Sequence, residues 1–154
     1  MIRVEINPSL ESSFDVVILQ KAGQVTIDHC QPDQVVDLTI LLTDDDQIRE
    51  MNKKYLNIDD TTDVLSFSSK EIDPDSNRIY LGDVIISHTR ALNQARLAGH
   101  DVKVELQLLV VHGVLHLLDY DHGDPDQKTR MWSAQEIILE KLGHSGIMII
   151  TEQG

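Results

Sequence analysis

Alternation of apolar and polar residues predicts four β-strands in this chain. Ile2, Val4 and Ile6 alternate with charged residues, which is the two-residue period of a strand with one buried face. The predicted strands cover residues 2–6, 35–42, 64–67 and 79–86, with a loop over residues 71–78. Gly82, inside the last strand, indicates a bulge or a close approach to its backbone.

Capping residues and glycine stops predict five helices. Asn7 followed by Pro8 is typical of an N-cap and a first helical position, and Gly23 is typical of a helix end. The predicted helices cover residues 8–22, 44–55, 88–98, 102–118 and 125–142. The fourth helix contains the almost wholly apolar run 106–118, so it is expected to be central and buried. These elements predict an α/β (α+β) fold with a four-stranded mixed sheet packed by about five helices.

Bulk composition favours a single globular domain over residues 1–154. Hydrophobic residues make up 41% of the chain, and no stretch is long enough to span a bilayer. The first residues do not resemble a signal peptide, and the lone Cys30 cannot form an internal disulfide. We therefore expect a cytoplasmic protein without a membrane partner.

The net charge restricts the classes of partner. A formal charge of −13 disfavours long-range attraction to nucleic acid or anionic lipid. It argues against a broad RNA-binding face and against DNA as a partner, although a local basic groove remains compatible with it.

Three histidines at offsets of four and then six residues provide the clearest chemical signal. His112 and His116 share one face of the predicted central helix, and a following turn presents His122. This is the zincin arrangement, in which a helix and the next turn together supply three ligands. Asp119 stands where that turn has glycine, but aspartate tolerates the left-handed conformation. Gly113 is expected to leave open space beside the first ligand.

The donor set favours zinc. Three neutral imidazoles suit Zn²⁺ and leave one position open, where the ion supplies Lewis acidity or an activated water. Surface or core histidines are the alternative, but three buried imidazoles without an ion would leave nitrogens needing partners. A closed structural site would need a fourth ligand, such as Asp121 or Cys30. A metalloprotease would have glutamate at the position of Gly113.

The segment from His112 to His122 closely resembles the signature of the YbeY family of bacterial rRNA maturation factors. Further motifs of that family match residues 52–55, 60–67, 81–87, 131–132 and 136, in the same order. The resemblance implies a zinc-dependent, single-strand-specific endoribonuclease with a four-stranded sheet. It also implies a role in 16S rRNA 3′-end maturation and ribosome quality control. The implied partners are single-stranded RNA, 16S rRNA, the small ribosomal subunit and ribosome-associated proteins.

Two positions depart from the family pattern. Leu56 stands where the family has an arginine, and leucine cannot bind phosphate. Asp119 replaces the glycine of the histidine turn. Nearby cations that can substitute for the arginine are Lys53, Lys54, Arg90 and Arg96.

Roles follow for the remaining polar residues. His112, His116 and Asp121 are the predicted catalytic residues, and Asp121 orients an imidazole as a hydrogen-bond acceptor. Asp63 and Asp83 are candidates for the same role, and all three aspartates can equally be turn, cap or solvated carboxylates. Surface or capping roles are expected for Glu105, His29, His88, His100 and His144.

Two other functions remain open. One is a metal-dependent hydrolase of another bond, such as a peptide, which the glycine after His112 argues against. The other is a non-catalytic ribosome-assembly factor with a structural metal, which Leu56 and the acidic charge favour.

Overall fold

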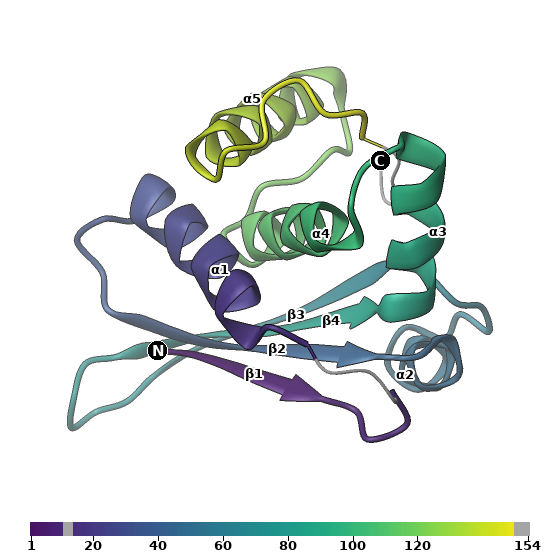
Figure 1. Cartoon of the computed structure of the whole chain (residues 1–154). Helices are drawn as coiled ribbons and strands as arrows, with labels where there is room; N and C mark the ends of the chain where they lie inside the picture. The colour runs from purple at the N-terminus through teal and green to yellow at the C-terminus, as the bar shows by residue number, and fades with distance from the viewer. Residues whose placement is uncertain (11–13, 150–154) are drawn as a thin grey trace.

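A four-stranded mixed sheet forms the base of the molecule (Figure 1). The computed structural model describes residues 1–10 and 14–149. The strands are β1 (Ile2–Ile6), β2 (Val36–Thr43), β3 (Val64–Ile72) and β4 (Ile79–Ser87). Their order across the sheet is β1-β2-β4-β3, and only β3, at one edge, is antiparallel to its neighbour.

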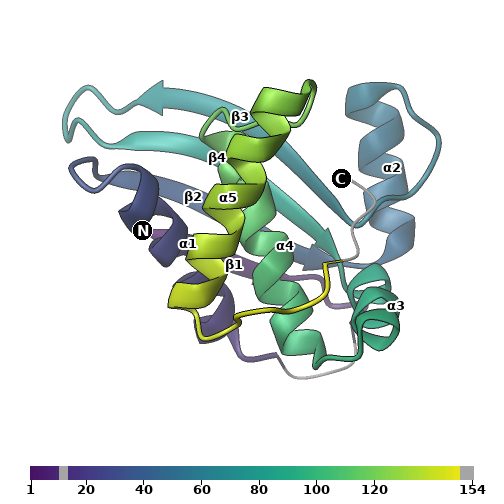
Figure 2. The same ribbon diagram turned by 90° about the horizontal axis from the view of Figure 1, so that it is seen from above.

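Helices cover the two faces of this sheet unequally. The helices are α1 (Val16–Cys30), α2 (Asp45–Leu56), α3 (His88–Ala98), α4 (Val102–Leu117) and α5 (Pro125–Lys141). Helices α1 and α4 lie over one face, and α5 packs on α4 away from the sheet (Figures 1 and 2). On the other face, Ile48 of α2 packs with Leu65 and Ile85. Over the described residues, the predicted α/β fold, with its mixed sheet and five helices, is confirmed.

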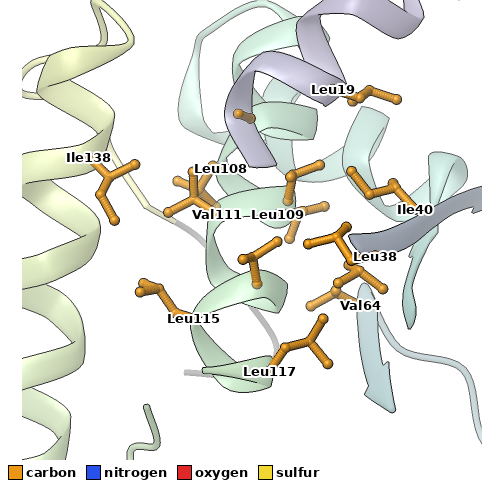
Figure 3. Packing of buried hydrophobic residues seen from close by; sticks show 14 of the residues in the cluster. Leu19, Leu38, Ile40, Val64, Leu108, Leu109, Val111, Leu115, Leu117 and Ile138 are labelled. Atoms are coloured by element: carbon orange, nitrogen blue, oxygen red, sulfur yellow. The ribbon is translucent and has the colours of Figure 1, made fainter. Parts of the chain in front are cut away.

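Helix α4 is buried along nearly its whole length, as its apolar run predicted. Its side chains pack between those of β2 and α1 on one side and those of α5 on the other (Figure 3). Each fully buried leucine contributes about 1.5–3 kcal/mol relative to exposure, so the helix is held firmly in place. No helix in the described part of the chain is both long and apolar enough to cross a membrane.

The first helix begins later than predicted. Asn7 does not cap a helix, because its side-chain oxygen accepts from Ser9 N within a turn. The N-cap is Asp15, which accepts from Val17 N at 3.0 Å; residues 11–13 of the predicted helix lie outside the described residues. Gly23 does not end the helix either. A Cβ there would lie 2.9 Å from Ile2 Cδ1, so the glycine permits close packing of α1 on β1.

Strand β3 is longer than predicted and therefore contributes more to one edge of the sheet. It continues to Ile72, so residues 71 and 72 belong to the strand and not to the loop. The irregularity predicted at Gly82 is confirmed, because the pairing of β2 with β4 shifts beside it. Gly82 has φ 137°, and a Cβ there would lie 2.0 Å from the Phe67 carbonyl oxygen of β3. The close approach is therefore between two backbones.

The expectation that the Glu105 side chain faces solvent is wrong. It is fully buried, and its Oε1 lies 2.9 Å from His100 Nε2. Burial raises the pKa of the Glu105 carboxyl, and the His100 partner opposes that shift. The contact joins the loop after α3 to the first turns of α4, so His100 is also a structural residue.

Candidate metal centre

The three predicted histidines converge at the C-terminal end of α4. One ring nitrogen from each of His112, His116 and His122 lies within 4.8 Å of the others. The Nε2 atoms of His112 and His116 are 3.2 Å apart, and the His116 and His122 ring centroids are separated by 5.2 Å. Three donors at these separations can hold a single metal ion.

The turn after α4 brings His122 back to the helix. Tyr120 N donates to Leu115 O at 3.0 Å, which reverses the chain directly after the last helical turn. Asp119 has φ 71°, so it adopts the left-handed conformation that its position was expected to require. Its carboxylate pairs with Lys70 of β3, but both side chains are exposed, so the pair stabilises little.

Two hydrogen bonds orient two of the three imidazole rings. His112 Nδ1 donates to Gln135 Oε1 of α5 at 3.0 Å, and both residues are fully buried. With the proton on Nδ1, the His112 Nε2 lone pair faces the other histidines. His116 makes its own hydrogen bond to the backbone of Tyr120. Both rings are therefore set for coordination before any ion binds.

Burial keeps these rings in the neutral form that binds metals. It lowers the pKa of His112 to about 4, and the neighbouring His116 contributes to that shift. The pKa of His116 is also lowered, first by burial and then by the charge of His122. At neutral pH the imidazole lone pairs of His112 and His116 are therefore available.

A polar atom without a partner supports the fit of a metal ion to this site. His122 Nε2 is buried, and no residue in the described part of the chain forms a hydrogen bond with it. Burying an unsatisfied polar atom costs roughly 1–3 kcal/mol. An ion at the centre of the cluster would accept the lone pair of this nitrogen, so the residues present suit a metal.

Gly113 does not leave open space, contrary to the sequence prediction. A Cβ there would lie 2.5 Å from Val84 Cγ1 and 3.3 Å from Ser66 Oγ. Ser66 Oγ also donates to the Gly113 carbonyl at 2.9 Å. The glycine lets α4 approach the sheet closely, and a glutamate general base would collide with β4 at this position.

The predicted orienting aspartates form the following contacts, and their role in orienting an imidazole stays a prediction. Asp121 Oδ1 accepts from His122 N at 2.8 Å, and the charge of Asp121 also opposes the lowering of the His116 pKa. Asp83 accepts from the Tyr80 hydroxyl, and Asp63 accepts from Gln94 Nε2 at 3.1 Å.

The sequence analysis did not predict a role for Gln135. The signal for it was a glutamine on the apolar face of the last helix, four residues after Met131 and three before Ile138. A polar residue at such a position needs a buried partner.

A cleft of about 580 Å³ opens beside His116. Its lining residues come from α2, the loop that follows it, β3 and the end of α4, and they are Asn52, Leu56, Ile58, Asp60, Thr61, Thr62, Val64, Leu65, Ser66, Ser68 and His116. None of the four cations predicted to replace the family arginine is among them. Lys54 lies over the Tyr55 ring, and Arg90 pairs with Asp45 at 3.5 Å.

Fold and site together define an α/β protein with a zincin-like candidate metal centre of three histidines. The family model described as Endoribonuclease YbeY matches residues 7–143, and the chain belongs to this family.

Similar proteins agree with this assignment. A protein of Acetivibrio thermocellus named Endoribonuclease YbeY is 39% identical over 150 residues, covering 89% of this chain and 93% of that protein. One of the same name from Heliobacterium modesticaldum is 38% identical, covering 88% and 87%. A Thermotoga maritima protein solved in solution has a TM-score of 0.61 at 24% identity, covering 92% of this chain and 89% of that one. This last similarity concerns the fold alone.

Replacement of Gln135 by leucine is expected to weaken zinc binding by roughly 10–100-fold, the usual effect of losing an outer-shell partner. Leucine fills a similar volume but cannot accept the His112 Nδ1 proton. Competition with a chromogenic chelator measures the affinity. Gln135→Glu is the control, because its carboxylate keeps the acceptor and should retain tight binding. Equal affinities for wild type and Gln135→Leu would show that the hydrogen bond does not support the ligand.

Proposed function

We propose that this protein is a zinc-dependent endoribonuclease that cleaves single-stranded RNA. The convergence of His112, His116 and His122, with a buried His122 nitrogen that has no hydrogen-bond partner in the described residues, carries the proposal. The names of its relatives support RNA as the substrate.

The residues of the chain have separate tasks in this proposal. A bound Zn²⁺ supplies Lewis acidity towards a phosphoryl oxygen and a water of lowered pKa. Gln135 and the Tyr120 backbone hold the rings of His112 and His116, so the donor atoms need little reorganisation. Asp121 holds the backbone of His122 through its Oδ1. The cleft is lined by β3, by α2 with the loop after it, and by His116 of α4. It suits an unstacked strand better than a rigid duplex.

The same proposal extends to the physiological substrate. We take this to be the 3′ end of 16S rRNA within the small ribosomal subunit, with ribosome-associated proteins as further partners. The net charge of −13 fits a protein that is delivered to RNA by such partners, because it provides no long-range attraction of its own.

One observation favours a second candidate, a ribosome-assembly factor with a structural ion. Among the described residues, no lysine or arginine lines the cleft beside His116 to stabilise the charge that develops on a phosphate during cleavage. A peptidase is not supported, because the glutamate base has no room at Gly113.

Cleavage assays separate these candidates. Purified protein loaded with one equivalent of zinc is expected to cut a single-stranded RNA and to spare the same sequence in a duplex. A chelator should stop cleavage, and added zinc should restore it. Tight zinc binding without any cleavage would instead support the assembly factor. Cleavage that persists in the chelator would contradict the proposed metal dependence.

A further inference from the structure

Several hydrogen-bond donors in the lining of the cleft beside His116 already donate to other groups of the protein. Asn52 Nδ2 donates to Asp60 O at 3.0 Å, and Thr61 Oγ1 donates to Asp45 at 3.1 Å. Ser66 Oγ donates to Gly113 O at 2.9 Å. A hydroxyl that has donated its hydrogen can only accept from a ligand. The hydroxyls of Thr61 and Ser66 therefore present acceptors.

One further acceptor strengthens this character. Asp60 also lines the cleft and brings a negative charge. Phosphate oxygens are acceptors and negatively charged, so this lining repels them. It suits a neutral group that carries N–H donors.

The wall of the cleft formed by α2 and the loop after it is apolar. Leu56 and Ile58 both line the cleft, and they are 49% and 50% exposed. Two half-exposed aliphatic side chains beside one cleft provide an apolar surface for the flat face of a ligand. Together, the cleft offers an apolar wall and a set of acceptors.

We infer that the part of this cleft between α2 and β3 binds an unstacked nucleobase with an exocyclic amino group, namely adenine, cytosine or guanine, and excludes the phosphate. The ring lies against Leu56 and Ile58, and its amino group faces the acceptors of Ser66, Thr61 and Asp60. The phosphate lies beyond these acceptors, at the His116 end of the cleft. This inference rests on the proposed function and adds a base subsite, and with it a sequence preference, to it.

Binding of short RNAs tests the inference independently of cleavage. Fluorescein-labelled 2′-O-methyl hexamers of adenine, cytosine, uracil and stable abasic units are titrated with the zinc-loaded full chain, and a gel checks that they remain intact. Anisotropy is expected to show the adenine and cytosine hexamers binding about tenfold or more tightly than the abasic hexamer, within the usual contribution of a bound base. The uracil hexamer should fall between them, because uracil has no amino group.

Variants of the apolar wall identify the site. Leu56→Ser is expected to weaken binding of the adenine and cytosine hexamers about three- to tenfold and to leave binding of the abasic hexamer unchanged. Leu97→Ser is the matched control, since Leu97 is 72% exposed on α3 and does not line the cleft. Leu97→Ser should leave the affinity for every hexamer unchanged. Thermal midpoints close to that of the wild type would confirm that both variants fold.

The outcomes separate the inference from the proposed function. Equal binding of abasic and adenine hexamers would overturn the base subsite while leaving the nuclease proposal intact. Equal weakening of every hexamer by Leu56→Ser would also overturn it. Absence of binding by all hexamers, together with absence of RNA cleavage, would overturn the proposed function and the subsite with it.

Discussion

His116→Ala protein is expected to lose stoichiometric zinc and RNA cleavage together. The substitution removes one of three donors whose nitrogens lie within 4.8 Å of one another, leaving two protein ligands. Loss of an outer-shell partner alone costs roughly 10–100-fold in metal affinity, so loss of a ligand should exceed about a hundredfold. Zinc content after dialysis and the single-turnover cleavage rate measure the two effects.

A matched histidine makes this test specific. His29 lies on α1 outside the cluster, where its ring contacts Lys141, and His29→Ala should retain zinc and activity. A His116→Ala protein that binds one zinc as tightly as the wild type would contradict the assignment of His116 as a ligand. Lost cleavage with zinc retained would give His116 a role in the reaction and not in metal binding.

Gly113→Ala is expected to destabilise the protein by about 1–3 kcal/mol, the usual cost of overpacking a core. The new methyl group would lie 2.5 Å from Val84 Cγ1, so α4 must move away from β4. The adjacent His112 would move with the helix, and zinc affinity should fall as well. Chemical denaturation of the zinc-free protein measures the stability, and chelator competition measures the affinity.

A double-mutant cycle with Val84 tests whether contact with that residue causes the loss of stability in Gly113→Ala. Val84→Ala removes the methyl groups that the new side chain meets, although it creates a cavity of its own. The double variant should be more stable than the sum of the single effects by roughly 0.5–3 kcal/mol, the range for residues in contact. Strict additivity would indicate that Gly113 matters for another reason, such as the flexibility of α4.

Local signals predicted most of the fold. Asp44, Ser87, Asp101 and Asp124 cap four helices that begin within one residue of their predicted starts, because a capping side chain and its backbone partner lie within three residues. The predicted start of α1 was wrong because Asn7 and Pro8 fit a turn as well as a helix start. Gly23 was misread because its role depends on contact with Ile2, which no local pattern reveals.

The same distinction applies to the site. The histidine spacing predicted the metal cluster because all three residues belong to one helix and the turn that follows it. Gln135 and Val84 approach from α5 and β4, far away in sequence, so their contacts with His112 and Gly113 were not predictable. The cleft beside His116 likewise depends on how α2 and β3 pack.

X-ray absorption at the zinc edge tests the three-histidine centre most directly. The wild type, loaded with one equivalent of zinc, should give a spectrum fitted by three imidazole nitrogens at about 2.0–2.1 Å and one oxygen ligand. The same measurement on His116→Ala protein should show loss of an imidazole or loss of the ion. A wild-type spectrum with fewer than three imidazoles, or with a thiolate sulfur from Cys30, would contradict the account.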